Sequence, residues 1–354
     1  MMLRTQECPL ATIRKTEGAD TANTTDGRKR SALLATLVAL SGLAVLTLAP
    51  SHAQAAWPER TIKIIVPFTA GGATDIVGRI VADELSRQLA TPAIVENREG
   101  AAGVIGVQAA TRAAPDGYTL LVTANSAVTS HKTLYKKLPY DPLRDLDPVS
   151  RISAGSHIIV VKASSPFKDV KDLLKAAAAK PGAISYGSGG NGSSVHLAAE
   201  LLQVQSGFKL LHVPYRGTSL AVTGLLAGDT DVMFDTTPSS YPRIKSGQLR
   251  ALGVTSLARA PELPDVPTVA EQGLPHYEVL LWLGLYAPKG TPPEILARID
   301  AAMKTLLATD RVSKRLDLLG MKPYYANGAD LGKQVARETA EWADVIHKAG
   351  VTLD

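Results

Sequence analysis

The sequence has a single cysteine among its 354 residues, and this residue, Cys8, lies near the N-terminus. The rest of the chain therefore has no thiol. This absence excludes disulfide bonds, cysteine nucleophiles and thiolate metal sites from almost the whole protein. Cys8 also precedes the long apolar run of the N-terminal region, so it is not the lipid-modified cysteine of a lipoprotein, which would follow such a run.

Closely spaced histidines are lacking as well. Six histidines follow residue 100, and no two of them are three or four positions apart, the spacing that puts two imidazoles on one face of a helix. They are His131, His157, His196, His212, His276 and His347. We therefore expect no metal site.

Neither sign of charge dominates. Without residues 1–55, which carry six basic and four acidic side chains, the 38 basic and 33 acidic residues fall to 32 and 29. The remaining chain is nearly neutral and has no basic cluster. This argues against nucleic acid as the partner.

The N-terminal region has the pattern of an export signal. Arg28, Lys29 and Arg30 precede a charge-free apolar run over residues 31–50, and the small-residue sequence AQA follows at 53–55. We expect cleavage after about Ala55 and a periplasmic location. The alternative is a membrane anchor, because the run approaches the ~20 residues of a spanning helix, but Gly42 and the cleavage-type end favour removal.

The remainder alternates strand and helix patterns. An apolar run at 61–68 ends at a glycine turn, and apolar residues then recur at helical spacing up to Leu89. Strand patterns at 93–97 and 118–125 enclose another helical pattern, and the region from 155 to 256 repeats this alternation. We expect an α/β protein with mostly parallel sheets. About 300 residues exceed what one core usually supports, which favours two such units.

Two glycine-rich loops stand between a strand and a helix. Their sequences are TAGGATD at 69–75 and GSGGNGSS at 187–194. The first N–H groups of a helix lack partners inside it and favour an anion. Each loop by itself is equally well explained as a tight turn with a helix cap, but two of them, one in each unit, favour binding. Backbone donors alone suffice for a small carboxylate, whereas a polyphosphate would require more positive charge than these loops carry.

The second loop also fits the dinucleotide pattern G-x-G-x-x-G. The acidic residue expected about 20 positions later is missing, although Arg216 could accept a 2′-phosphate, so an NADP site stays open. Ser193 stands where a nucleotide-binding P-loop has lysine, which argues against a nucleoside triphosphate. No G-x-S-x-G hydrolase motif occurs.

A series of short sequences from about Trp57 to the C-terminus resembles a known family. They include VPFTAGGATD, AAPDGYTLL, ISYGSGGNGSSVHLAAELL, VPYRGTS, DVMFDT, GQLRALGVTS and LPDVPTVAEQG, in this order. Together they resemble the periplasmic solute-binding proteins of tripartite tricarboxylate transporters, the Bug family. The resemblance implies a clamshell of the periplasmic-binding-protein type, type II-like, that closes on a small carboxylate and delivers it to a two-component membrane permease.

In such folds the chain crosses twice between the two domains. We place the crossings near residues 151–157 and 249–255. Residues 56–155 and 253–354 then form domain 1, and residues 156–252 form domain 2, each a mostly parallel sheet flanked by helices.

The resemblance also implies the ligand-binding residues. They are Phe68, Thr69, Ala70, Gly71 and Gly72 in the first loop, Ser188, Gly189, Gly190, Asn191, Gly192 and Ser193 in the second, and Thr123, Asn125, Tyr215 and Asp235 at strand ends. Asp235 would repel a carboxylate, so it would act through water, a ligand hydroxyl or amino group, or as a structural group. For Tyr215, core packing is an equal alternative. We expect Asp75 to cap its helix and His196 to be packed, not catalytic.

Two residues depart from the usual family pattern. Glu99 stands where proline is more common, and we expect this change to alter a surface turn without affecting the pocket. His131 replaces part of a frequent Asn-Pro pair. If His131 reaches the cleft, it adds a pH-dependent donor.

The leading hypothesis is a non-catalytic, monomeric periplasmic receptor for a mono- or dicarboxylate, without a cofactor. The enzyme alternative is an exported NADP-dependent oxidoreductase, based on the second glycine loop and Arg216. A third possibility is a ligand-sensing module that reports to a membrane kinase, since the same clamshell serves both roles.

Overall fold

The computed structural model describes residues 57–353, and the expected export signal lies outside them. The first half of this part contains β1 (Ile62–Val66), α2 (Ala73–Leu89), β2 (Ala93–Asn97), η1 (Ala101–Gly103), α3 (Val104–Thr111), β3 (Thr119–Ala124), α4 (Ser126–Thr129), α5 (His131–Leu134), α6 (Pro142–Asp145), β4 (Leu146–Lys162), α7 (Val170–Ala179) and β5 (Ser185–Ser188). The second half contains α8 (Ser194–Ser206), β6 (Leu211–Pro214), α9 (Thr218–Ala227), β7 (Val232–Thr236), α10 (Thr237–Lys245), β8 (Leu249–Val254), η2 (Ala270–Gln272), β9 (Leu280–Pro288), α11 (Pro293–Leu307), α12 (Asp310–Asp317), β10 (Lys322–Asn327) and α13 (Gly328–Ala349).

The β1–α2–β2 unit forms as the apolar pattern predicts. Strand β1 pairs in parallel with β2 on one side and with β3 on the other. Helix α2 buries Val77, Val81 and Leu85 in the same apolar cluster as Ile62 and Ile64 of β1. The apolar stripe of the helix therefore fixes the direction of its N-terminus relative to the end of β1.

Strands β5, β6 and β7 form a second parallel group. Strand β5 pairs in parallel with β6 and with β7. Helices α8 and α9 follow β5 and β6, and both contact β7, while α9 also contacts β5. This arrangement repeats the first group, as the sequence predicts.

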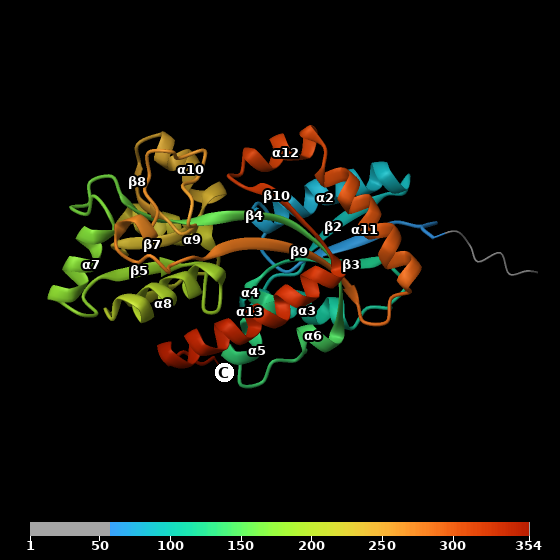
Figure 1. Cartoon of the computed structure of the whole chain (residues 1–354), viewed down its shortest axis with the longest axis horizontal. Helices are drawn as coiled ribbons and strands as arrows, with labels where there is room; N and C mark the ends of the chain where they lie inside the picture. The colour runs from blue at the N-terminus through green and yellow to red at the C-terminus, as the bar shows by residue number, and fades with distance from the viewer. Residues whose placement is uncertain (1–56, 354) are drawn as a thin grey trace, which may run out of the picture. The chain divides into compact units, whose positions relative to one another are not determined.

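Two long strands join these groups. The 17-residue β4 pairs antiparallel with β9 over residues 146–156 and with β7 and β8 over residues 157–162. Figure 1 shows β4 and β9 running side by side between the two strand groups. The prediction of mostly parallel sheets is therefore wrong in part. The sheet is mixed, because β4, β9, β8 and β10 are antiparallel to their neighbours and need no crossover helix.

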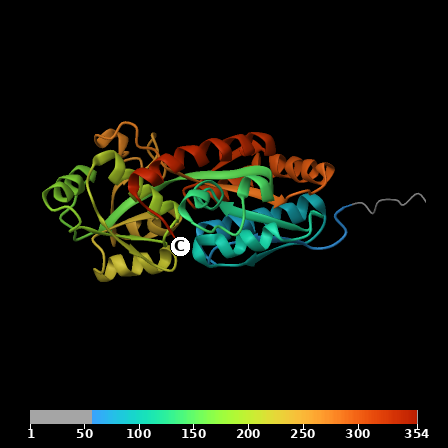
Figure 2. The same cartoon turned by 90° about the horizontal axis from the view of Figure 1, so that it is seen from below.

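The apolar core follows the same division. Two clusters enclose β1, β3 and β9, and two others enclose β5, β7 and the second half of β4. Val254, Leu263, Val269 and Val279 pack in the clusters of the second strand group. Helix α13 lies along both groups (Figure 2) and contacts α8 as well as β4 and α4.

The α/β class is confirmed. The C-terminal region contains the helices α11, α12 and α13 and also the short strand β10, which was not predicted from the sequence. No helix among residues 57–353 is long and apolar enough to cross a membrane.

Candidate functional site

Several helices begin around one small cavity of about 110 Å³. It is lined by Gly72, Ala73 and Thr74 at the start of α2, Ser193, Ser194 and Val195 at the start of α8, Gly217 and Thr218 at the start of α9, Ser126 of α4, Thr236 before α10, and Phe68, Thr69, Ala102, Ala124, Gly189 and Leu281. None of these lining residues is charged, and seven carry a hydroxyl group. The cavity is therefore a site at which positive helix ends meet without a charged side chain.

The helix starts leave N–H groups for a ligand. Gly72 before α2, Gly217 before α9 and Thr236 before α10 make no side-chain capping hydrogen bond. The first-turn N–H groups of a helix have no partner within the helix. Such groups, together with hydroxyl donors, can hold the two oxygens of a carboxylate.

Asp75 fixes the first loop. Its buried carboxylate accepts hydrogen bonds from Gly71 N at 2.9 Å, Arg79 Nε at 3.0 Å and Asn97 Nδ2 at 2.8 Å. Burial raises the pKa of Asp75, but the hydrogen bonds from Arg79, Gly71 and Asn97 outweigh it, so that its pKa lies below the usual value. Asn97 Nδ2 also donates to Phe68 O at 3.1 Å. Asp75 does not line the cavity. It is not the N-cap of α2, which is Gly72, but lies in the first turn and supports the loop from behind by binding Gly71 N.

The second loop satisfies some of its own donors. Gly190 N donates to Ser188 Oγ at 3.1 Å, and Gly192 N donates to His196 Nδ1 at 3.1 Å. The Ser193 hydroxyl donates to Gly190 O at 2.7 Å and accepts a hydrogen bond from His196 N. Two N–H groups that the sequence analysis assigned to an anion are therefore already engaged. The Ser193 N–H also donates to Gly190 O at 3.2 Å, so the N–H groups left for a ligand on this side of the cavity are those of Ser194 and Val195.

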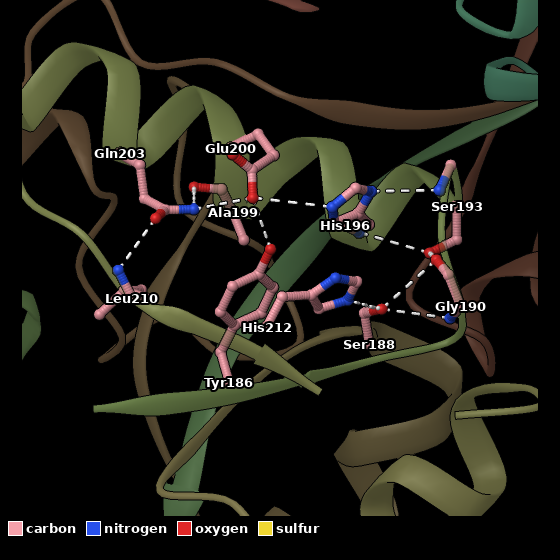
Figure 3. Close-up of polar contacts among 11 residues, drawn as sticks. Tyr186, Ser188, Gly190, Ser193, His196, Ala199, Glu200, Gln203, Leu210 and His212 are labelled. Atoms are coloured by element: carbon pink, nitrogen blue, oxygen red, sulfur yellow. Dashed lines mark hydrogen bonds and ion pairs between the residues drawn. The ribbon is translucent and has the colours of Figure 1, made fainter. Parts of the chain in front are cut away.

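His196 and His212 stack behind this loop (Figure 3). Their ring centroids are 4.2 Å apart, and the Ser188 hydroxyl lies 2.7 Å from His212 Nε2. Burial lowers the pKa of His196 to about 3 and that of His212 to about 4. Because a backbone N–H can only donate, Nδ1 of His196 must be unprotonated, and its role as a packed residue is confirmed.

A buried glutamate anchors the far side of the stack. Glu200 Oε1 accepts hydrogen bonds from Tyr186 OH at 2.6 Å and from Gln203 Nε2 at 2.8 Å, and lies 3.6 Å from His196 Nε2. Tyr186 stacks on His212 with ring centroids 4.7 Å apart. Figure 3 shows that these side chains come from β5, α8 and β6, so the loop packs on a layer of stacked and hydrogen-bonded side chains.

His131 contacts the loop from the other strand group. It is fully buried, with Nε2 3.3 Å from Gly192 O and Nδ1 3.2 Å from Tyr140 OH. Burial lowers the pKa of His131 to about 4, against the opposite effect of the hydrogen bond with Gly192. His131 does not line the small cavity or the cleft beside it, because its ring is enclosed between α5 and the loop.

A larger cleft of about 790 Å³ adjoins the small cavity and shares Phe68, Thr69, Ala102, Gly189 and Gly217 with it. The other lining residues are Pro67, Glu99, Gly100, Ala101, Gly103, Tyr135, Gly190, Asn191, Pro214, Tyr215, Arg216 and Leu353. The expectation that Glu99 leaves the pocket unaffected is wrong. The turn after β2 has positive φ at residues 100–103, which folds this segment onto the cleft.

The structure brings together eight of the expected ligand residues around these two cavities. They are Phe68, Thr69, Gly72, Gly189, Gly190, Asn191, Ser193 and Tyr215. The ring of Tyr215 packs against Gly187 and Gly224, so this residue contributes to the core as well as to the cleft wall. Residues 100–103, Ser126, Thr218 and Thr236 also line these cavities but were not predicted from the sequence. The paired glycines Gly100 and Gly103 were a usable signal for the first of these.

The other expected residues do not line either cavity: Ala70, Gly71, Gly192, Ser188, Thr123, Asn125 and Asp235. Asn125 lines a separate cavity of about 350 Å³ beside α13, and its Nδ2 donates to Leu280 O at 3.0 Å. Asp235 is fully buried and accepts hydrogen bonds from Ser240 Oγ at 2.5 Å and Thr236 N at 2.7 Å. Burial raises the pKa of Asp235 to about 6. It is a structural group at the start of α10.

Sequence comparison finds relatives over most of the chain. Residues 77–351 match the family described as the tripartite tricarboxylate transporter family receptor. A protein encoded in the tcbD–tcbE intergenic region of a Pseudomonas species is 41% identical over 87% of this chain and 92% of its own length. BugT of Bordetella pertussis is 34% identical over 91% of this chain and 98% of its own length.

Comparison with solved structures finds relatives with a similar fold. The periplasmic binding protein BugD is 34% identical, covers 84% of this chain and 99% of its own, and superposes with a TM-score of 0.78. An R. palustris protein solved with adipate is 32% identical with a TM-score of 0.80, over 84% of this chain and 99% of its own. MatC of Rhodopseudomonas palustris, with bound malate, is 32% identical with a TM-score of 0.77, over 82% of this chain and 100% of its own. The chain therefore has the periplasmic-binding-protein clamshell fold, and it belongs to the TctC/Bug family of tripartite tricarboxylate transporter receptors.

Proposed function

We propose that this receptor binds one carboxylate of a small organic acid in the 110 Å³ cavity at the helix starts and holds the rest of the ligand in the adjoining cleft. The convergence of the α2, α8 and α9 N-termini on an uncharged cavity carries this proposal. Malate and adipate, which are bound to two of its relatives, are both small dicarboxylates.

The available donors give enough affinity for such a ligand. A hydrogen bond to a charged group contributes about 1.5 to 3 kcal/mol, so three or four give roughly 5 to 12 kcal/mol before the cost of association. Micromolar binding requires about 8 kcal/mol. No arginine clamp is needed within the cavity, which agrees with its uncharged lining.

We propose that the receptor is not catalytic. The cavity holds hydroxyl and backbone donors, and the nearest histidines face the protein interior. A buried neutral His196 with its Nδ1 occupied by Gly192 N is not available as a general base for a ligand.

The two strand groups support a division into two domains that close around the ligand. Residues 57–155 would lie in domain 1 and residues 156–252 in domain 2, as expected from the sequence. The packing of Val254, Val269 and Val279 with domain 2 favours a second crossing near Leu280 instead of residues 249–255. Domain 1 would then resume with β9, and the β4–β9 pair would act as the hinge.

We further propose that the receptor is a monomer that is exported with cleavage after about Ala55. It delivers its ligand to a two-component membrane permease. The family match supports the transport role. Export requires a test of its own, because the signal lies outside the described residues.

A thermal-shift titration tests the function. The purified protein is heated with malate, adipate, NADP or no addition. A ligand that binds only the folded state at 100 times its Kd stabilises it by about 2.7 kcal/mol. We expect a shift with at least one acid and none with NADP. A shift with NADP alone would replace this proposal by the oxidoreductase alternative.

A further inference from the structure

The outer cleft has two charged side chains in its lining, Glu99 and Arg216, and the remaining lining residues are uncharged. Both are exposed. Neither side chain has an ion pair or a hydrogen bond to another residue of the part that the structure describes. An acid and a base without protein partners thus face the same 790 Å³ cleft.

These charges come from opposite sides of the cleft. Glu99 follows β2 in the first strand group, and Arg216 follows β6 in the second. The neighbouring Arg98 does not neutralise Glu99, because its Nε is bound to Glu96, which also pairs with Lys63 at 2.6 Å. Glu99 is therefore the acidic side chain available to a ligand on this wall of the cleft.

The two cavities differ in what they recognise. The inner cavity is uncharged and fits one carboxylate group, so the distal end of the ligand extends past Thr69 and Gly217 into the cleft that contains Glu99 and Arg216. A distal carboxylate would be attracted by Arg216 and repelled by Glu99. A distal end that carries both a carboxylate and an ammonium group would be attracted by both side chains.

We propose that Glu99 and Arg216 form a second subsite that binds the distal end of the ligand and selects amino-substituted dicarboxylates over dicarboxylates without an amino group. This inference rests on the proposed function, since it requires the first carboxylate to occupy the helix-start cavity. It assigns Glu99 as a determinant of ligand preference in this chain.

Calorimetric titration with adipate and 2-aminoadipate tests the subsite, because these probes share one carbon chain and differ by one ammonium group. We expect the protein to bind 2-aminoadipate about fivefold more tightly than adipate, the scale of partly exposed ion pairs. Glu99→Gln should abolish this preference by weakening 2-aminoadipate binding and strengthening adipate binding. Arg216→Gln should weaken both acids by a similar factor. Added salt should reduce the preference of the unaltered protein.

Glu294→Gln and Arg112→Gln are the matched controls, because both residues lie outside the cleft. Both should keep the affinities and the preference of the unaltered protein. A preference that Glu99→Gln leaves unchanged, or binding of malate or adipate without binding of 2-aminoadipate, would overturn the subsite but leave the proposed function intact. Failure of the unaltered protein to bind any of the three acids would overturn both.

Discussion

Thr69 and Gly217 lie against each other across the cleft. A Cβ atom placed on Gly217 would come within 3.6 Å of Thr69 Oγ1. Thr69 belongs to the loop that starts α2, and Gly217 precedes α9, so the loops of the two strand groups meet at this point. Both residues line the inner cavity and the outer cleft, so they mark the boundary between the two.

Gly217→Val should reduce carboxylate affinity by at least tenfold. The side chain would narrow the passage beside Thr69, and the backbone at φ +105° is strained for any residue with a Cβ. Gly228→Val is the matched control, because Gly228 ends the same helix at φ +93° with open space around it. Calorimetry on both variants checks this. Equal loss of affinity in both would show that strain, and not the passage, explains the effect.

Asp75→Ala should lower the free energy of unfolding by about 1 to 3 kcal/mol and weaken ligand binding, because Gly71 N and Asn97 Nδ2 would lose their buried acceptor. Asp344→Ala removes an acid from an exposed pair of the same spacing, Asp344–Lys348, and should have little effect. Urea unfolding measures the stability of both variants, and calorimetry at neutral pH measures their affinity for the ligand. Unchanged affinity in Asp75→Ala would mean that the first loop holds its form without this support.

His196→Asn and His196→Leu should differ in their affinity for the carboxylate ligand. Asparagine places an oxygen close to the position of Nδ1, where it can accept the Gly192 N–H, whereas leucine leaves that N–H unpaired. We expect His196→Asn to bind the carboxylate within severalfold of the unaltered protein and His196→Leu to bind at least tenfold more weakly. Stability is measured in parallel. Equal affinities in the two variants would contradict a positioning role for His196.

Stability should fall below pH 6.5, because the buried His131, His157 and His196 and the half-buried His212 have lowered pKa values, at about 4 for His131 and His212 and about 3 for His157 and His196. As the pH falls, the unfolded chain binds protons at a higher pH than the folded protein. The contribution of each neutral histidine to the free energy of unfolding is therefore complete above pH 6.5 and declines as the pH falls toward the pKa of that histidine in the folded state. At pH 5 the loss is on the order of 2 kcal/mol for each of the three buried histidines and smaller for His212. Asp235, with a pKa raised to about 6, acts in the opposite direction but is a single group.

His157→Leu isolates one of these groups. The imidazole of His157 is fully buried, and neither ring nitrogen has a partner among residues 57–353. The variant should lose less stability than the unaltered protein between pH 7.5 and pH 5 in urea titrations. His347→Leu, at an exposed position, is the control. The same pH dependence in His157→Leu and in the unaltered protein would contradict the buried, neutral histidine.

The local units of this fold could be predicted from the sequence, because apolar periodicity fixes them. The β2 pattern at residues 93–97 matches the observed strand, and both glycine loops open helices as expected. The antiparallel β4–β9 pair and β10 could not be predicted, since pairing between residues more than 100 positions apart leaves no local pattern. The predicted parallel arrangement therefore holds only within each strand group.

The two glycine loops that open α2 and α8 could be predicted as parts of the candidate site, whereas the turn at residues 100–103 was missed. Ala101 and Ala102 adopt positive φ without being glycine, so the turn that brings Glu99 to the cleft was not recognised. The family resemblance implied Asp235 as a pocket residue at a strand end, but its carboxylate turns toward Ser240 and the start of α10. Side-chain direction at a strand end depends on the next helix, which the sequence pattern does not specify.

A crystal structure of the protein with the acid that gives the largest thermal shift tests the central claim most directly. The account predicts one carboxylate in the cavity between Gly72 and Ser193, with its oxygens within hydrogen-bond distance of first-turn N–H groups of α2 and α8. A carboxylate bound only at Arg216, or in the separate cavity beside α13, would contradict it.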